Sequence, residues 1–301
     1  MKNKIVITTG DVNGIGAEVT IKALKKFDCK DFVLVSNSRI LKYYGMKPEP
    51  CEIIEIPFDS EIHPGKITAE SGEFSYQLLK KACELKPKAI VTAPVSKEAL
   101  HLAGHFYNGQ TEILESFLSG NGRKAEMLFA ARNFRVLILT RHCALKDVKI
   151  TKELIISKVL TLKNALNKED LHIAFCGLNP HAGENGVIGK EENEIITPAI
   201  EELRKMGINA DYPKSADTLF IQANETFKNG AKQPYDCYIA MYHDQGLIPM
   251  KLIAMDEAVN VTIGLDILRT SPAHGTAFDI ADKNIANPNS MISAIKYAIK
   301  K

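Results

Sequence analysis

The sequence lacks the features that mark membrane, secreted or nucleic-acid-binding proteins. Its 301 residues contain no run of the ~18 apolar residues that a membrane span needs. The amino terminus has only the short apolar run 5–9, without the longer core and cleavage site of a signal peptide. The formal net charge is only +2, from 38 basic and 36 acidic residues, which favours neither nucleic acid nor an anionic membrane as partner. We therefore expect a cytoplasmic protein.

Cysteines at the spacing of a metal or redox motif are also missing. The six cysteines are scattered along the chain, and no two have the C-x-x-C spacing of a redox or zinc motif. Most have apolar neighbours, as Cys176 has within the segment 172–176. We therefore expect reduced cysteines in a protein core rather than a disulfide framework or a zinc–thiolate site.

What the sequence does contain is a regular alternation of short apolar runs and longer amphipathic segments. The length leaves room for about two domains. The expected strands are 4–9, 32–36, 51–56, 88–92, 126–130, 134–140, 171–176, 236–241 and 259–264. The expected helices are 16–27, 69–85, 111–119, 152–166, 190–206 and 289–300. This alternation predicts an α/β protein with a mostly parallel sheet, and Gly120-Asn121-Gly122 is the best early domain break.

The first strand–helix junction is rich in glycine. Gly10, Gly14 and Gly16 let the backbone turn sharply and approach a ligand, and the following helix offers free N–H groups. The spacing is G-x-x-x-G-x-G, which differs from the Rossmann fingerprint, and no acidic residue closes a clear second strand about 20 residues further on. A ligand-binding loop and a plain tight turn are both compatible with this pattern.

Two further loops carry polar residues after predicted strands or before helices. Ser96 and Lys97 follow Pro94, where Ser96 is best explained as a helix N-cap. Gln110 and Thr111 either begin a helix or hydrogen-bond a polar substrate.

Three histidines follow predicted strands: His142, His181 and His243. Ligands of open α/β sheets bind beyond the carboxyl ends of the strands, which is where these residues fall. Neutral imidazoles suit a divalent transition-metal ion, although each histidine alone is more often structural. The remaining candidates are Lys251 and Arg269, which can hold phosphate or carboxylate, and Asp217, which can orient a ligand, act as a base or cap a helix.

Several of these segments together resemble the 4-hydroxythreonine-4-phosphate dehydrogenase family of pyridoxal phosphate synthesis. The matching segments are 10–18, 92–97, 109–115, 177–192, 215–220, 242–251 and 260–281, and the most specific are Gly-Leu-Asn-Pro-His-Ala-Gly-Glu at 177–184 and Tyr-His-Asp-Gln-Gly-Leu at 242–247. The resemblance implies two α/β/α domains with the isocitrate/isopropylmalate dehydrogenase-like fold, not a Rossmann fold. It places 1–119 plus 270–301 in a cofactor-side domain and 120–269 in a metal, substrate and dimerisation domain. It also implies a homodimer with a shared active site.

The resemblance assigns roles to individual residues. The implied metal ligands are His142, His181 and His243, contributed from both subunits to a zinc, magnesium, cobalt or manganese ion. The implied substrate-binding residues are Gln110, Thr111, Lys251, Asn260 and Arg269, and the candidate catalytic residues are Asp217 and Lys251. The candidate cofactor-binding residues are Gly14, Gly16, His274, Asp279 and Asn287. An acidic residue matching Asp279 favours the ribose hydroxyls of NAD and repels the 2′-phosphate of NADP, so we predict NAD.

The implied reaction is metal- and NAD-dependent oxidation of 4-phosphooxy-L-threonine to a β-keto acid, which decarboxylates to 3-amino-2-oxopropyl phosphate. One departure bears on the substrate: the family usually has histidine where this chain has Gln110, which can hydrogen-bond but cannot carry a proton. This keeps open a dehydrogenase of another phosphorylated hydroxy acid, such as a phosphothreonate or phosphoerythronate. A phosphate acyltransferase and a non-catalytic phosphate-ligand sensor are the alternatives from other classes, and neither needs the three histidines.

Overall fold

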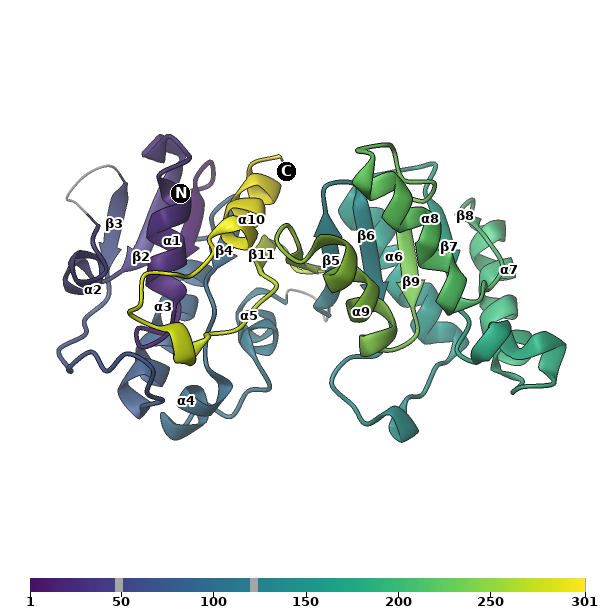
Figure 1. Ribbon diagram of the computed structural model, residues 1–301, viewed down its shortest axis with the longest axis horizontal. Helices are drawn as coiled ribbons and strands as arrows, with labels where there is room; N and C mark the ends of the chain where they lie inside the picture. Colours follow the sequence, from purple (N-terminus) through teal and green to yellow (C-terminus); the bar gives the residue numbers. More distant parts are fainter. Residues whose placement is uncertain (47–50, 120–123, 301) are drawn as a thin grey trace. The chain divides into compact units, whose positions relative to one another are not determined.

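The chain forms two compact units, each built on a twisted sheet with helices (Figure 1). The computed structural model describes residues 1–46, 51–119 and 124–300. Unit 1 comprises Met1–Ala125 and Val259–Lys301, and unit 2 comprises Glu126–Ala258. The chain thus crosses into unit 2 once and returns. The expected domain boundaries at 119/120 and 269/270 fall elsewhere because 259–269 pair with strands of unit 1, and the expected break at 120–122 lies outside the described residues.

The strands of unit 1 are largely buried apolar runs. They are β1 (Ile5–Thr8), β2 (Phe32–Ser36), β3 (Glu52–Glu55), β4 (Ala89–Thr92), β10 (Val259–Ile263) and β11 (Leu268–Pro272), in the spatial order β3-β2-β1-β4-β11-β10. All neighbouring pairs are parallel except β10 and β11, which are antiparallel. Because β1, β2 and β4 are buried on both faces, their sequences are nearly continuous in Val, Ile and Leu.

The helices of unit 1 cover this sheet in two groups. They are α1 (Gly16–Leu24), α2 (Ser38–Tyr43), α3 (Ala69–Glu84), α4 (Lys97–Leu102), α5 (Gln110–Leu118) and α10 (Asn289–Ile299). The α3 helix packs on β1 and β2 and against α4 and α5, whereas α10 packs on β10 and β11 beside α1. Side-chain caps begin three of them: Asn37 Oδ1 accepts from the Arg39 amide, Thr68 Oγ1 from the Ser71 amide, and Ser96 Oγ from the Ala99 amide. The N-cap interpretation of Ser96 is therefore confirmed.

The sheet of unit 2 has the order β5-β6-β9-β7-β8. Its strands are β5 (Glu126–Ala131), β6 (Phe134–Ile138), β7 (His172–Phe175), β8 (Asn209–Ala210) and β9 (Cys237–Ala240). Strands β5 and β6 form an antiparallel hairpin, and the other pairs are parallel. The helices are α6 (Lys152–Leu166), α7 (Thr197–Lys205), α8 (Ala216–Lys228) and α9 (His243–Ala254), and a π-helical turn at Glu192–Ile196 leads into α7.

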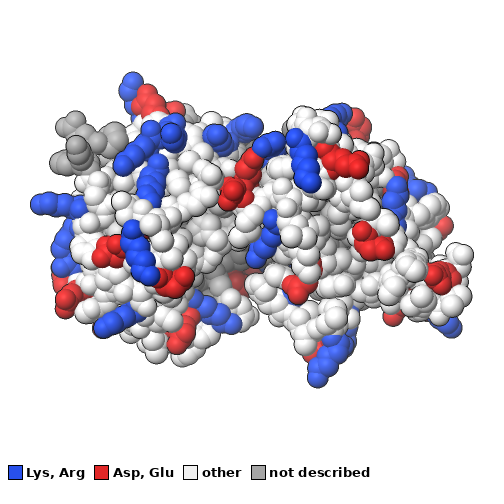
Figure 2. All heavy atoms as spheres, in the orientation of Figure 1, with Lys and Arg blue, Asp and Glu red and all other residues white. Residues whose placement is uncertain are grey.

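Every expected strand and helix is present, and the structure adds elements that the sequence analysis did not predict. The additional strands are β8 and β11, and the additional α-helices are α2, α4, α8 and α9. None of the described helices is long and apolar enough to cross a membrane. On the face that Figure 2 shows, basic and acidic side chains are interspersed, with no large field of one sign.

The expectation of six reduced cysteines is wrong for one pair. Cys29 and Cys51 form a disulfide, with 4.9 Å between their Cα atoms. Cys29 lies shortly before β2 and Cys51 immediately before β3, and these strands are parallel neighbours, so the same ends of both strands bring the two residues together. Cys83, Cys176 and Cys237 are free and buried, as expected, whereas Cys143 is free and exposed.

Candidate functional site

A buried arginine is the main polar feature of unit 1. Arg269, on β11, is 2% exposed. Its Nε and Nη2 atoms both donate to Thr92 Oγ1, at 3.0 and 2.7 Å. Nη1 donates to Thr262 Oγ1 at 3.2 Å, and Nη2 also donates to Gln110 Oε1 at 3.1 Å. The fold sets up this cluster because β11 lies between β4, which ends at Thr92, and β10, where Thr262 is paired with Arg269.

The charge of Arg269 is not neutralised by these contacts. All three side chains that accept its hydrogen bonds are uncharged, and within the described residues no carboxylate forms an ion pair with it. Burial lowers the pKa of Arg269 to about 10, and the nearby charge of Glu112 counteracts part of that shift. A buried guanidinium without a directly bonded carboxylate favours binding of an anion, and its fork geometry suits phosphate or carboxylate.

The neighbouring predicted substrate residues belong to the same unit. Gln110 is the first residue of α5, and Thr111 is buried beside it. Asn260 and Thr262 lie two residues apart on β10, so their side chains share one face of the sheet with Arg269. The Oδ1 atom of Asn260 is buried and has no hydrogen-bond partner in the described part of the chain. Of the five predicted substrate residues, Gln110, Thr111, Asn260 and Arg269 therefore belong to unit 1, and Lys251, exposed on α9, belongs to unit 2.

The glycine-rich loop packs tightly against its own unit. A Cβ at Gly14 would lie 2.9 Å from the Thr276 carbonyl oxygen, and one at Gly16 would lie 2.2 Å from the Thr9 carbonyl oxygen. The Ile15 amide donates to the same Thr276 oxygen at 3.0 Å. These contacts alone require small residues at Gly14 and Gly16, whatever ligand the loop binds.

The predicted cofactor segment is anchored to α1. Lys22 Nζ donates to the carbonyl oxygens of Asn284 and Ala286 at 2.9 and 3.1 Å. Glu18 Oε1 accepts from Lys22 and from the Ala286 amide at 2.7 and 2.9 Å. Asp279 and Asn287 are exposed on this segment, and His274 is half-buried with its Nδ1 near the Gly275 carbonyl oxygen.

Two of the three predicted metal ligands lie together in unit 2. The imidazole rings of His142 and His243 have centroids 5.6 Å apart. His142 follows β6 and His243 follows β9, and these parallel strands are neighbours, so their carboxyl ends present both rings at one edge of the sheet. Neutral imidazoles at this spacing fit a shared transition-metal ion.

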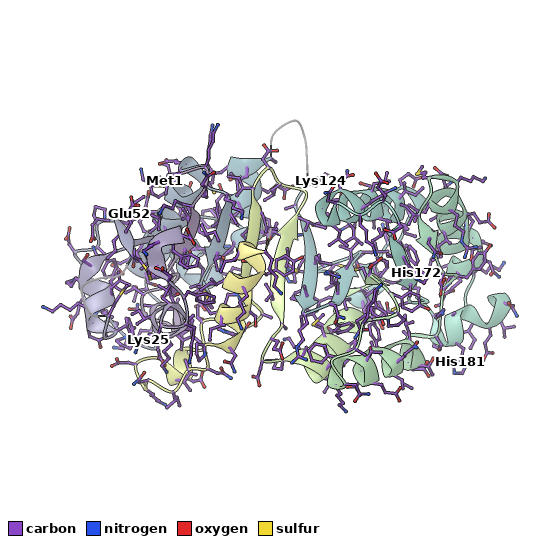
Figure 3. The ribbon with its side chains drawn as sticks, turned by 90° about the horizontal axis from the view of Figure 1, so that it is seen from above. Met1, Lys25, Glu52, Lys124, His172 and His181 are labelled. Carbon is purple, nitrogen blue, oxygen red and sulfur yellow. A yellow bond between two sulfur atoms is a disulfide. The ribbon has the colours of Figure 1, made fainter. Side chains whose placement is uncertain are left out.

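His181 is not part of this pair. It is 62% exposed and lies at the periphery of unit 2 (Figure 3). Its Nδ1 lies 2.6 Å from Glu184 Oε1, and this hydrogen bond raises the pKa of the imidazole. It begins a run in the left-handed region, from φ 50° at His181 to φ 56° at Asn185. Within the described residues, no three His, Cys, Asp or Glu side chains are placed to hold a metal ion. In the described part of one chain, only His142 and His243 of the three predicted ligands lie side by side.

The loop that carries His181 rests on a carboxylate that sequence reasoning missed. Glu192 is buried, and its two oxygens accept from the Asn179 amide at 2.8 Å and from Asn179 Nδ2 at 2.9 Å. A Cβ at Gly183 would lie 2.6 Å from Glu192 Oε2, so the glycine leaves room for this contact. The local sequence gives no signal for this role, because it depends on how the loop folds onto Glu192.

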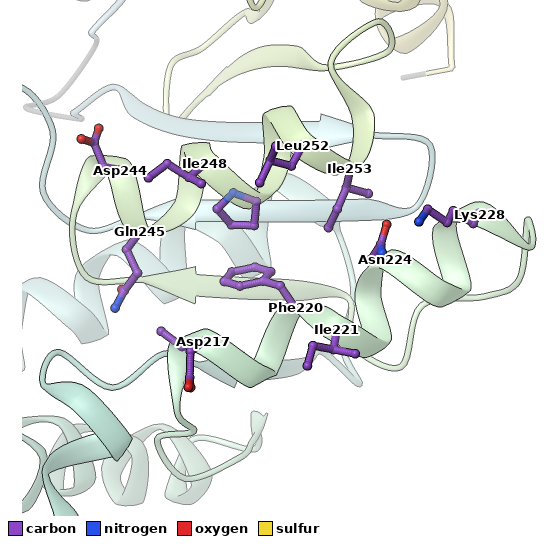
Figure 4. A pocket seen from close by; sticks show the side chains of 12 residues that line it. Asp217, Phe220, Ile221, Asn224, Lys228, Asp244, Gln245, Ile248, Leu252 and Ile253 are labelled. Carbon is purple, nitrogen blue, oxygen red and sulfur yellow. The ribbon is translucent and has the colours of Figure 1, made fainter.

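Asp217 lies at the edge of a groove between α8 and α9. The groove has a volume of about 550 Å³ and is lined mainly by apolar side chains, among them Ile221, Ile248 and Leu252, with Asp217 and Asp244 also contributing (Figure 4). Asp217 is exposed, and its hydrogen bond from Ser215 lowers the pKa of its carboxyl group. It is therefore ionised at neutral pH.

Comparison with solved structures defines the class of protein. Isocitrate dehydrogenase from Methylococcus capsulatus has the same fold, with a TM-score of 0.52 at 16% identity over all of this chain and 85% of that one. The two-unit α/β architecture is thus the one predicted, and a Rossmann fold is excluded.

A family model described as pyridoxal phosphate biosynthetic protein PdxA matches residues 3–298, and the chain belongs to this family. A 4-hydroxythreonine-4-phosphate dehydrogenase from Sulfurihydrogenibium is 38% identical, with 98% of this chain and 97% of the relative covered. A D-threonate 4-phosphate dehydrogenase from Salmonella typhimurium is 36% identical, with 98% of each covered. The crystal structure of 4-hydroxythreonine-4-phosphate dehydrogenase from Klebsiella pneumoniae has a TM-score of 0.84 at 32% identity over 99% of each chain. The relatives are dehydrogenases, and this chain is a member of their class.

Proposed function

We propose that this protein oxidises the secondary hydroxyl of a phosphorylated hydroxy acid and that the β-keto acid so formed loses carbon dioxide. The observation that carries this proposal is the buried guanidinium of Arg269, which forms no ion pair in the described part of the chain and favours an anionic ligand. The leading substrate is 4-phosphooxy-L-threonine, which would give 3-amino-2-oxopropyl phosphate for pyridoxine 5′-phosphate synthesis. Family membership and the relatives' names support this choice.

The second candidate substrate is D-threonate 4-phosphate. Relatives of that name are about as similar to this chain as the hydroxythreonine enzymes are. Gln110, in direct contact with Arg269, is the residue by which this chain departs from the family resemblance. Both candidates share a phosphate group, a carboxylate and a secondary hydroxyl, so the chemistry required of the protein is the same.

The roles of the chain's own residues follow from their chemistry. Arg269 and Lys251 hold the anionic groups of the substrate, and Asn260 and Thr111 add hydrogen bonds. These contacts lie away from the reacting carbon, and their binding energy positions that carbon for oxidation. Asp217, which is ionised, accepts the hydroxyl proton as general base, and Lys251 stabilises the negative charge that develops as carbon dioxide leaves.

We assign the metal ligands to His142 and His243 of one subunit, with His181 of a second subunit as the third. The donor set of imidazoles favours zinc or cobalt over magnesium and manganese. A divalent ion held by these imidazoles would supply Lewis-acid chemistry at the substrate hydroxyl. The two-histidine arrangement within one chain supports a shared site rather than one completed internally.

We assign NAD to the segment that contains His274, Asp279 and Asn287, beside Gly14 and Gly16. NAD supplies the hydride acceptor. The exposed carboxylate of Asp279 accepts hydrogen bonds from ribose hydroxyls and repels a 2′-phosphate, which makes NADP the poorer cofactor.

A homodimer is part of the proposal because the metal site needs a second subunit. Ile221, Ile248 and Leu252 are 56%, 58% and 82% exposed on α8 and α9, an apolar face that a second copy of the chain would cover. Light scattering of wild type and Leu252→Asp tests this assignment. The proposal expects a dimeric mass that falls toward that of the monomer in the variant, and a monomeric wild type would contradict it.

The experiment that tests the function is a substrate screen followed by absorbance of reduced nicotinamide. Purified protein is incubated with NAD⁺ and with 4-phosphooxy-L-threonine, 4-phospho-D-threonate or 4-phosphoerythronate, with and without a chelator. The proposal expects reduction with at least one of these acids and loss of that activity with chelator. Absence of reduction with all of them, in protein reconstituted with zinc or cobalt, would contradict it.

A further inference from the structure

The side-chain amide of Gln110 is held in one orientation by two contacts of opposite kind. Its Oε1 accepts from Arg269 Nη2 at 3.1 Å, and its Nε2 donates to the Ala93 carbonyl oxygen at 3.1 Å. A guanidinium can only donate and a carbonyl can only accept, so the reversed amide would lose both hydrogen bonds. Gln110 is therefore fixed between the end of β4 and Arg269.

The hydrogen bond from Arg269 to Gln110 is one of four that fix the orientation of the guanidinium. Four hydrogen bonds from Arg269 go to Thr92, Thr262 and Gln110, and all three acceptors are neutral. The arginine fork is thus held on several sides without a carboxylate. A carboxylate at position 110 would keep the acceptor for Arg269 and neutralise the cation, but it would lose the hydrogen bond to the Ala93 carbonyl oxygen.

We propose that Gln110 is a positioning residue that fixes the Arg269 fork without adding a negative charge to it, and so sets the anion affinity of this site. The proposal rests on the assignment of Arg269 to the substrate's anionic group. Glutamine is suited to this role because its amide oxygen accepts as a carboxylate oxygen does but adds no charge. It also has no titratable proton, so the contribution of Gln110 itself to anion binding does not change between pH 6 and 8.

The isosteric variant Gln110→Glu tests the charge directly, with Gln222→Glu, on the exposed surface of α8, as matched control. The readouts are the shift in Tm caused by inorganic phosphate and the KM and kcat for the substrate found by the screen. For wild type and the control, phosphate raises the Tm. For Gln110→Glu, the phosphate-induced shift is lost, and KM rises at least a hundredfold while kcat changes less than tenfold. The absolute Tm is not the readout, because the variant also loses the hydrogen bond to Ala93. A merely structural role would leave the phosphate response intact.

A second variant, Gln110→His, tests the same idea through pH, with sulfate as a probe because it remains a dianion from pH 6 to 8. In wild type the sulfate Kd changes less than twofold over this range, whereas in the variant sulfate binds at least fivefold more tightly at pH 6 than at pH 8. Unchanged phosphate response in Gln110→Glu, or no phosphate response in wild type, would overturn the proposal. Loss of phosphate binding in Gln110→Glu with no turnover of any hydroxy acid by wild type would uphold the role of Gln110 and refute the proposed function.

Discussion

The imidazole rings of His142 and His243 lie 5.6 Å apart between centroids, although the two residues are separated by about one hundred positions in the sequence. Adjacent parallel strands bring them together, since Ile138 on β6 pairs with Ala240 on β9 and each histidine follows its strand. The pair is the part of the proposed metal site that one chain builds alone.

Replacing either histidine of this pair should abolish tight metal binding. Imidazole is a preferred ligand of zinc, and alanine removes one of the three that we propose. We therefore expect His243→Ala to weaken zinc affinity at least a hundredfold. Metal content after dialysis, measured by mass spectrometry, gives the result. His63→Ala, a variant of a half-buried histidine in unit 1, serves as control and should retain metal. Equal metal content in both variants would remove the basis of the ligand assignment.

Arg269→Lys should fail as a conservative substitution. Lysine cannot reproduce the fork that reaches Thr92, Thr262 and Gln110 together, and a hydrogen bond to a charged group contributes about 1.5–3 kcal/mol. We expect kcat/KM to fall by roughly a hundredfold or more, mostly through KM. Arg132→Lys, in an exposed pair with Glu257, is the matched control and should behave as wild type. Wild-type kinetics in Arg269→Lys would show that the fork does not bind substrate.

Asp279 should set the cofactor preference. We expect wild type to favour NAD⁺ over NADP⁺ in kcat/KM, and Asp279→Asn to reduce that ratio by roughly tenfold, since one repulsive charge beside the 2′-phosphate is removed. The control is Asp282→Asn, an exposed acidic residue of the same segment whose carboxylate accepts from Tyr43. A wild-type preference for NADP⁺, or equal ratios in wild type and Asp279→Asn, would contradict the assignment.

Asp11 should make the folded state less stable as pH rises. Burial raises the pKa of this carboxyl from 3.8 to about 6, although the Asn13 amide and Ser71 hydroxyl hydrogen-bond to it. Between these two pH values the unfolded chain releases the proton and the folded chain retains it, so the free energy of unfolding decreases by about 3 kcal/mol in total from this group. Above pH 6 the contribution is constant.

Urea unfolding of wild type and Asp11→Asn between pH 3.5 and 8 measures this effect. The variant lacks the group, so the difference in unfolding free energy between the two proteins should change in its favour as pH rises from about 4 to about 6. Its absolute stability is not the readout, because an amide replaces one acceptor by a donor. Parallel pH profiles would show that Asp11 does not titrate in the folded state as described.

Much of the fold was predictable because buried parallel strands are continuous apolar runs. The strands β1, β2 and β4 are of this kind, and glycine or proline follows shortly after β1 and β4. Strand β11 was missed because its sequence, Leu-Arg-Thr-Ser-Pro, is largely polar and lacks the continuous apolar run of the other buried strands. Helix α9 was missed because Pro249 lies inside it and its apolar residues face both the sheet and the outer groove.

The candidate site was predictable only in part. The positions of His142, His181 and His243 after strands follow from the alternation of strands and helices. The contact of Arg269 with Thr92 and the disulfide between Cys29 and Cys51 depend on which strands are neighbours, and strand order is not encoded in local sequence. The buried role of Glu192 likewise follows from the tertiary structure of the loop that it supports.

The most direct test of the account compares each phosphorylated hydroxy acid with its unphosphorylated parent as substrate for NAD⁺ reduction by the zinc- or cobalt-loaded protein. The hydroxyl to be oxidised is the same in both, and only the anionic group differs. We predict that kcat/KM for 4-phospho-D-threonate or 4-phosphooxy-L-threonine exceeds that for threonate or hydroxythreonine by at least a thousandfold. Equal values for the two members of a pair would show that the buried arginine does not select the substrate.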